Sequence, residues 1–169
     1  MNTSAGFRLP DDLKIRHELR PGDLGRLIAL HGQVYADEPG FGPEFEAFVA
    51  RTVAEYGLDN RFRGRVWLLE RGDELVGCAA IAHRGGGRAQ LRWVLLARAV
   101  RGTGLGRHLV ETALGYCRSK GYGEVYLETT DGLEASTGLY RKLGFDHVSS
   151  EPVPLWAGVR PLMRMRKIL

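Results

Sequence analysis

A basic, glycine-rich turn between a strand-like run and a helix-like run constrains this chain more than any other feature. The turn has glycine at every second position, and its residues are Arg101, Gly102, Thr103, Gly104, Leu105, Gly106 and Arg107. Glycines leave backbone N–H groups unobstructed, and the N-terminus of the following helix adds unpaired N–H groups and the positive end of its dipole. The stretch therefore predicts a strand, a turn and a helix that cradle an anion such as a phosphate, with Arg101 and Arg107 at the rim.

The spacing of the glycines narrows the choice among nucleotide-binding motifs. A dinucleotide fingerprint, G-x-G-x-x-G, does not close, because the third glycine position falls on Arg107 or Leu109 in the two possible frames. A Walker loop is absent from the sequence as well. A nicotinamide-dependent oxidoreductase stays open as an alternative, since Glu128 sits about where an acid that binds a ribose is expected. A further alternative is that the glycines only form a turn between a strand and a helix and bind no ligand.

Length and composition bound the class of protein. The 169 residues suit one domain, over residues 1–169, with residues 1–12 as a flexible segment. No apolar run is long enough to span a membrane, and residues 1–12 lack the apolar core of a secretory signal, so we expect a cytoplasmic protein. The net charge of +4 comes from scattered residues, which argues against nucleic acid as a partner. Cys78 and Cys117 stand alone, so neither a disulfide nor a metal site is predicted.

The hydrophobic pattern predicts an ordered series of strands and helices. Alternation marks strands over residues 13–20, 65–70, 74–83, 89–96, 124–129, 145–149 and 162–168, and helical spacing marks helices over 24–35, 45–56, 105–117 and 135–143. Asp23 is expected to cap the first helix, and a segment with Pro152, Pro154 and Pro161 is expected to separate the last two strands. An antiparallel meander followed by a strand-helix-strand crossover is a mixed α/β architecture.

Two motifs resemble a known superfamily. The turn is similar to the Q/R-x-x-G-x-G/A pyrophosphate loop of the GNAT superfamily of acyl-CoA-dependent N-acyltransferases, with Arg101 directly before the first glycine. Residues 139–145, L-Y-R-K-L-G-F, look like the L-Y-x-x-x-G-F signature of that superfamily's last helix. Residues 19–148 are similar, more narrowly, to the acetyltransferase half of MarR-type winged-helix fusion proteins. The resemblance implies a GNAT-like α/β fold whose mixed, mostly antiparallel sheet of about seven strands is flanked by four helices.

The resemblance also implies a cofactor and a set of site residues. Acetyl-CoA would be the cosubstrate, with its diphosphate in the turn and its pantetheine arm along the strand end formed by Val94, Leu95 and Leu96. Tyr140 would act as the general acid that protonates the leaving thiolate, although its ring could instead only cover the sheet. The strand over 89–96 has no carboxylate where some relatives place a base, so Glu38 and Glu128 are the candidates, with water as the alternative.

The resulting hypothesis is transfer of an acetyl group from acetyl-CoA to a primary amine of a small molecule or a protein. The alternative is a non-catalytic acyl-CoA-binding regulatory module, which would explain why the strand over 89–96 has no carboxylate to act as a base. Neither reading involves a metal, a membrane or nucleic acid. The closing strands could pair across a homodimer.

Overall fold

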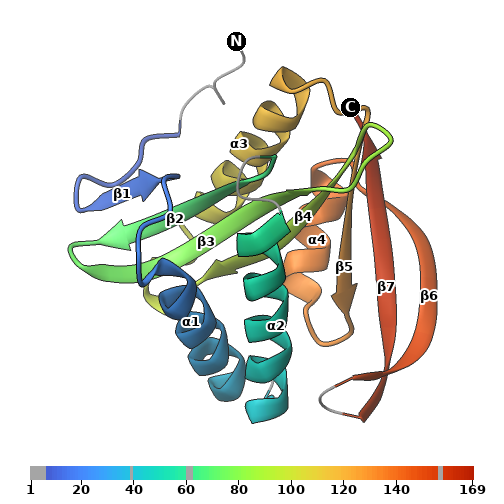
Figure 1. Ribbon diagram of the computed structural model, residues 1–169, viewed down its shortest axis with the longest axis horizontal. Coiled ribbons are helices and arrows are strands. Elements are labelled where there is room, and N and C mark those ends of the chain that lie inside the picture. The colour runs from blue at the N-terminus through green and yellow to red at the C-terminus, as the bar shows by residue number, and fades with distance from the viewer. Residues whose placement is uncertain (1–6, 39, 60–62, 156–157) are drawn as a thin grey trace.

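The computed structural model describes residues 7–38, 40–59, 63–155 and 158–169, and it contains one seven-stranded sheet (Figure 1). The strands are β1 (Leu13–Arg16), β2 (Arg65–Arg71), β3 (Glu74–His83), β4 (Arg88–Leu96), β5 (Glu124–Thr130), β6 (Asp146–Leu155) and β7 (Gly158–Ile168). The helices are α1 (Asp23–Asp37), α2 (Pro43–Asp59), α3 (Leu105–Ser119) and α4 (Glu134–Lys142), with a single 3-10 turn, η1, at Arg98–Val100. The predicted α/β architecture, a mostly antiparallel sheet with four helices, is confirmed.

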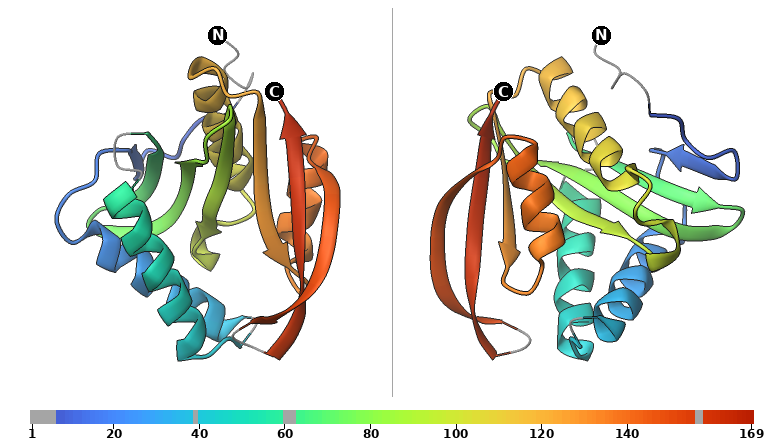
Figure 2. Two further views of the ribbon diagram at one scale, coloured as in Figure 1. Left: turned by 45° about the vertical axis from the view of Figure 1, so that its right-hand side comes forward. Right: turned by 180° about the vertical axis from the view of Figure 1, so that it is seen from behind.

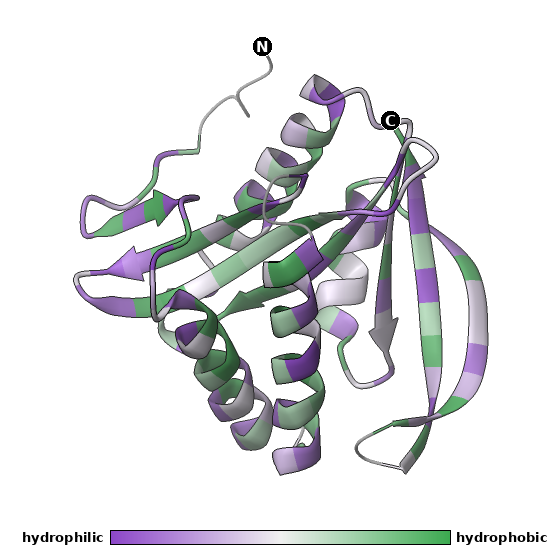
Figure 3. Cartoon of the chain, in the orientation of Figure 1, coloured by the Kyte–Doolittle hydropathy of each residue, from purple (hydrophilic) through white to green (hydrophobic). Residues whose placement is uncertain are grey.

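The helices cover the sheet from both sides. Helices α1 and α2 lie on one face, and α3 and α4 lie on the other, as the view from behind shows (Figure 2). Strand β3 is buried from Leu75 to Ala82, because it runs through the middle of both cores. Strand β7, next to the edge strand β6, alternates between hydrophilic and hydrophobic residues (Figure 3). Its Met165 is buried, and the neighbouring Arg164 and Arg166 are exposed. Such alternation is expected where a single face of a strand is covered.

The sheet opens between its two parallel strands. Its order is β1-β2-β3-β4-β5-β7-β6, and all neighbours are antiparallel except β4 and β5, which the helix α3 connects as predicted. Strands β4 and β5 pair only over residues 88–90 and 124–126, after which they diverge (Figure 1). Among the described strands, none pairs with residues 91–96 of β4 on the side facing β5. The fold therefore leaves open backbone on β4 at the strand end that leads into the glycine-rich turn.

Three expectations about element boundaries are corrected. Strand β1 ends at Arg16 instead of residue 20, since its pairing with β2 covers only residues 13–16. Gly22 is the N-cap of α1, and Asp23 is its first helical residue. The prolines do not separate the last strands: Pro152 and Pro154 lie within β6, which is an edge strand, where a missing N–H donor is tolerated. Pro161 precedes Leu162, the first residue of β7 that pairs with β5.

The N-terminal segment lies against α3. Phe7 stacks on His108, with ring centroids 4.4 Å apart, and the N–H of Leu13 donates to the carbonyl of Pro10 at 3.0 Å. Residues 1–6 of the segment predicted to be flexible lie outside the described residues.

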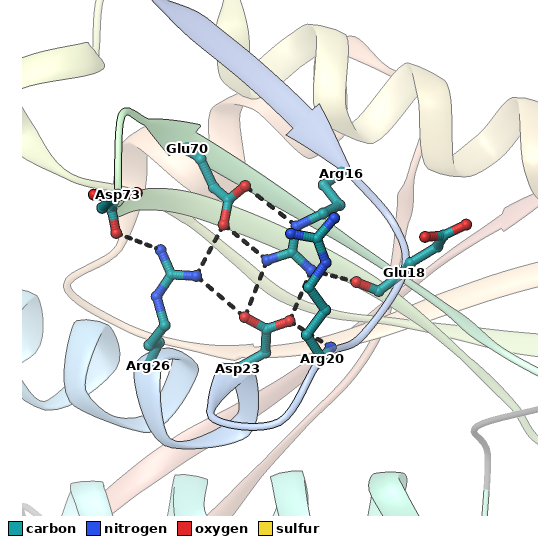
Figure 4. Close-up of polar contacts among 7 residues, drawn as sticks. All are labelled: Arg16, Glu18, Arg20, Asp23, Arg26, Glu70 and Asp73. Carbon is teal, nitrogen blue, oxygen red and sulfur yellow. Dashed lines mark hydrogen bonds and ion pairs between the residues drawn. The ribbon is translucent and has the colours of Figure 1, made fainter.

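A four-residue charge network ties β1 and β2 to the start of α1 (Figure 4). Arg16 binds Asp23 through Nη1 and Glu70 through Nη2, both at 2.8 Å. Arg26 contacts the same two carboxylates through Nη1, at 3.1 Å to Asp23 and 2.8 Å to Glu70. The Asp23 side chain is only 4% exposed, so the network is largely withdrawn from water.

Acid should weaken the fold through this network. Hydrogen bonds from Arg16 lower the pKa of Asp23 to about 2 against the opposing effect of burial, and they lower the pKa of Glu70 as well. A carboxylate whose pKa is lower in the folded state adds stability above its unfolded pKa of about 4, and that stability is lost as the pH falls toward 2. We expect urea unfolding to show wild type more stable than Asp23→Asn by about 2 kcal/mol at pH 7, with the gap closing between pH 4 and 2. A gap that does not change with pH would contradict this assignment.

Candidate active site

The glycine-rich turn forms an open row of backbone N–H groups at the start of α3. Gly102 and Gly104 have φ angles of 78° and 84°, a conformation that favours glycine, and Gly104 is the N-cap of α3 without a side-chain cap. Across the parts of the chain that the structure describes, the N–H groups of residues 102–107 have no backbone acceptor. Residues 102–104 are exposed, so these donors and the positive end of the helix dipole are available to an anion. We call residues 101–107 the cradle.

The two arginines of the cradle are held by neighbouring side chains. Arg101 donates from Nε to the carbonyl of Leu96 at 2.9 Å and from Nη1 to Oε2 of Glu38 at 2.7 Å. Arg107 donates from Nε to Oε1 of Glu111, one turn further along α3, at 2.8 Å. Arg101 therefore links the strand end of β4 to the end of α1, while Arg107 stays on the outer surface of α3.

A strained residue marks the open edge of β4. Trp93 has a φ of 49°. In the described part of the chain it is the only residue other than glycine with a positive φ. It lies at a bulge, because β3 pairs Cys78 with Leu95 and Ala80 with Arg92, leaving two residues of β4 opposite one of β3. Such a conformation costs on the order of 1–3 kcal/mol and persists only where the surrounding structure imposes it, often at functional sites.

Two hollows meet beside this bulge. The cradle groove is lined by the strand end Val94, Leu95 and Leu96, by Arg101, Gly106 and Glu38, and by the first turns of α4. The inner cavity is lined by side chains of α1, α2, β4, β5 and α4, including Tyr140 and Glu128. Both hollows share Tyr35, Val94, Leu133 and Ser136, which we call the junction. A long ligand bound at the cradle could therefore follow β4 to the junction and meet a second molecule there.

Tyr140 lines the inner cavity and is buried. Its ring packs edge-on against Phe145, with centroids 5.8 Å apart. Burial raises the pKa of its hydroxyl, and nearby Tyr35 raises it further. The pKa of Tyr35 itself is raised to about 12, again mainly by burial. Both phenols are therefore protonated at neutral pH, which is the form that a general acid requires.

The structure separates the two predicted carboxylates. Glu38 lies on the groove side, where Arg101 holds it, and Glu128 lies on the cavity side with Tyr140. Glu128 also pairs through Oε1 with Nη2 of Arg164 at 2.6 Å. The geometry thus brings Glu128 and Tyr140 to one cavity, and it brings Glu38 to the cradle.

Several residues of this region were not singled out from the sequence. Tyr35 and Ser136 form part of the junction, and His31 and Arg92 line the inner cavity. Burial lowers the pKa of His31 to about 4, and its Nδ1 lies 2.8 Å from the carbonyl of Leu27. For His31 and Tyr35 the sequence held only an indirect signal, since helical spacing marks residues 31 and 35 as core positions.

Residues 7–38, 40–59, 63–155 and 158–169 contain no group of three or more His, Cys, Asp or Glu side chains placed to hold a metal ion. Within the same ranges, the helices are too short or too polar to cross a bilayer.

Curated relatives share part of this chain. The Escherichia coli N-acetyltransferase YjgM, itself uncharacterized, is 33% identical over 106 residues, which are 57% of this chain and 64% of that protein. The mycothiol acetyltransferase of Acidothermus cellulolyticus is 32% identical over 155 residues, 82% of this chain and 46% of that protein. The chain thus covers less than two thirds of the length of these relatives.

Solved structures share the fold. The Salmonella typhimurium protein yncA, whose structure contains its cofactor acetyl-CoA, matches with a TM-score of 0.73 over 94% of this chain and 95% of its own, at 19% identity. The ribosomal-protein-S18-alanine N-acetyltransferase of Escherichia coli matches with a TM-score of 0.69 over 92% and 93% of the two chains, at 20% identity. The model of the Acetyltransferase (GNAT) family matches residues 33–145, more than half of the sequence, and the chain belongs to that family.

Proposed function

We propose that this chain transfers an acetyl group from acetyl-CoA to the primary amine of a second molecule. The observation that carries the proposal is continuity: a row of free N–H donors leads along an unpaired strand edge to a junction with a second cavity. Family membership and the acetyl-CoA bound to yncA support the same conclusion. Acetyl-CoA would supply the acetyl group as an activated thioester.

The cradle and the edge of β4 suit the two ends of this cosubstrate. N–H groups of residues 102–107 would bind the diphosphate, and the open backbone of residues 94–96 would hydrogen-bond the amides of the pantetheine arm. Arg101 already occupies the carbonyl of Leu96 and pairs with Glu38, so this arginine would have to turn partly toward the ligand to contact a phosphate. The narrower resemblance of residues 19–148 to the acetyltransferase half of MarR-type winged-helix fusion proteins stays a prediction.

The residues of the inner cavity can move the two protons of the reaction. As the amine nitrogen bonds to the carbonyl carbon and the carbon–sulfur bond breaks, Tyr140 would give its hydroxyl proton to the leaving sulfur. Glu128 would take a proton from the amine, directly or through water, because it lines the same cavity. Glu38 is the second candidate base, acting from the groove side.

Tyr140→Phe should lower kcat about 100-fold. This is the low end of the range for general acid catalysis, because a thiolate is a good leaving group and needs little protonation. KM for acetyl-CoA should change little, because the phenol is placed to act on the leaving sulfur instead of the cradle. Steady-state kinetics with thiol detection would measure both constants. A variant with unchanged kcat would restrict Tyr140 to packing against Phe145.

The proposed function itself is tested with acetyl-CoA and a panel of primary amines, by following thiol release and the mass of the acetylated product. Acetylation of at least one amine, abolished by disrupting the cradle, is the expected result. Tight binding of coenzyme A without turnover on any amine would favour the non-catalytic binding module. Thermal protection by NAD instead of coenzyme A would favour the oxidoreductase, although a sheet with a single parallel pair lacks the doubly wound arrangement of that class.

We further propose that the acceptor is a small molecule or a protein amine in the cytoplasm. A homodimer through the edge strand β6 is also proposed, and the prolines at 152 and 154 would limit pairing to the rest of that strand.

A further inference from the structure

The inner cavity contains the guanidinium group of an arginine, Arg92. Arg92 lines the cavity from β4, is half-buried, and lies with its Cζ 5.3 Å from the centroid of the Trp93 ring. In the described part of the chain, no carboxylate forms an ion pair with it. Burial and the neighbouring Arg84 lower the pKa of Arg92, and the charges of Glu128 and Glu55 partly oppose that shift. A guanidinium in this setting is stabilised by any anion that enters the cavity.

The other ionisable side chains of the cavity are not within ion-pair distance of Arg92. Glu128 forms its ion pair with Arg164, at 2.6 Å through Oε1. His31 is neutral at physiological pH, since its pKa is lowered to about 4 and its Nδ1 is bonded to the carbonyl of Leu27. Arg92 and Glu128 are the cavity's two charged lining residues, and Glu128 pairs with Arg164 outside the lining, whereas Arg92 has no ion pair among the described residues, so its guanidinium is available to an anionic ligand.

Much of the remaining wall is aromatic or aliphatic, and its polar members include Gln90, Thr129 and Ser136. Tyr35 and Phe45 are in contact, with ring centroids 4.5 Å apart, and Phe41 lies 5.3 Å from Phe45. The wall is completed by Phe48, Trp93, Leu155 and Leu162. A ligand that fills this cavity should therefore combine one anionic group with a bulky apolar body.

The anion and the reacting amine must also lie close to each other. Arg92 is two residues before Val94, which belongs to the junction. Two residues of extended strand span at most about 7 Å. An amine at the junction and an anion at Arg92 can therefore belong to one small molecule, and a single guanidinium matches the planar, singly charged carboxylate.

We propose that the acceptor is a free amino acid with a bulky apolar side chain, whose carboxylate is bound by Arg92 while its amine lies at the junction beside Tyr140. The apolar side chain occupies the aromatic wall, and the free oxygen of Glu128 faces the amine. This inference rests on the proposed function, because only an acetyl acceptor needs its amine at the junction.

The test compares three amines that differ only at the carboxylate: phenylalanine, its primary amide, and phenethylamine. With acetyl-CoA saturating, wild type should acetylate phenylalanine with a kcat/KM about 30-fold above that of either analogue. Arg92→Gln should reduce this preference to near one by lowering kcat/KM for phenylalanine, with the analogues little changed. Arg84→Gln is the matched control, since Arg84 lies nearby, bonds Gln90 through Nε and is absent from the cavity lining; it should keep the preference.

Binding separates a failure of this inference from a failure of the proposed function. Calorimetry would measure coenzyme A on the free protein, and then phenylalanine and phenethylamine on the protein saturated with coenzyme A. If coenzyme A does not bind, the proposed function fails. If coenzyme A binds but phenylalanine binds no better than phenethylamine, or neither binds, the carboxylate assignment is overturned while the proposed function stands. An equal loss of all three activities in Arg92→Gln would also overturn it.

Discussion

Replacing Gly104 with aspartate should raise the dissociation constant for coenzyme A about 1,000-fold. Gly104 is the N-cap of α3 and the middle glycine of the cradle, with a φ of 84°. A carboxylate there would accept the N–H groups that otherwise bind the diphosphate, and it would repel that diphosphate. Loss of two charge-assisted hydrogen bonds amounts to about 4 kcal/mol, which is about three orders of magnitude in affinity.

A second glycine separates this effect from backbone strain. Gly72, in the turn between β2 and β3, has a φ of 56°, and a side chain added there would meet nothing within 4 Å. Gly72→Asp imposes a similar conformational cost of about 1 kcal/mol on folding but leaves the cradle intact. Isothermal titration should therefore show wild-type affinity for coenzyme A in Gly72→Asp. Equal affinity for coenzyme A in Gly104→Asp and Gly72→Asp would show that the cradle does not bind the cofactor.

The features that could be predicted from the sequence are local ones. The turn was predictable because glycine at 102 and 104 signals positive φ angles within a few residues of the helix that follows. The order of strands and helices followed from alternation and helical spacing, and the parallel crossover around α3 followed from that order. The turn and each single strand or helix are therefore marked by residues that are close in the sequence, and the crossover follows from the order of three such elements.

The features that escaped prediction depend on contacts between distant residues. Arg101 was expected at the rim of the cradle, but its contact with Glu38 joins positions 63 residues apart. Asp23 fits the pattern of a helix cap, and its place in a charge network depends on Arg16 also binding Glu70, which is 54 residues from Arg16 in the sequence. Likewise, the strained Trp93 arises at a bulge in the pairing of β4 with β3, for which the sequence around residue 93 carries no signal.

Removing Arg16 should destabilise the protein by about 3 kcal/mol, because the buried Asp23 and the half-buried Glu70 would lose the better buried of their two shared arginines. In Arg16→Met, Asp23 and Glu70 would both depend on Arg26, whose side chain is 33% exposed, against 13% for Arg16. The two carboxylates would then repel each other across a site largely closed to water. Since folded domains are stable by only about 5–15 kcal/mol, the midpoint of urea unfolding should fall by an amount easily measured.

An exposed arginine provides the matched control for this substitution. Arg8 pairs with Asp11 at 2.9 Å, but their side chains are 83% and 86% exposed, so Arg8→Met should cost less than about 0.5 kcal/mol. The same change from arginine to methionine thus distinguishes a buried network from a solvated pair. Similar small losses in both variants would mean that Arg26 alone satisfies Asp23 and Glu70. Affinity for coenzyme A should match wild type in Arg16→Met at temperatures where it is folded, because the network joins β1, β2 and α1 and none of its members lines the cradle groove.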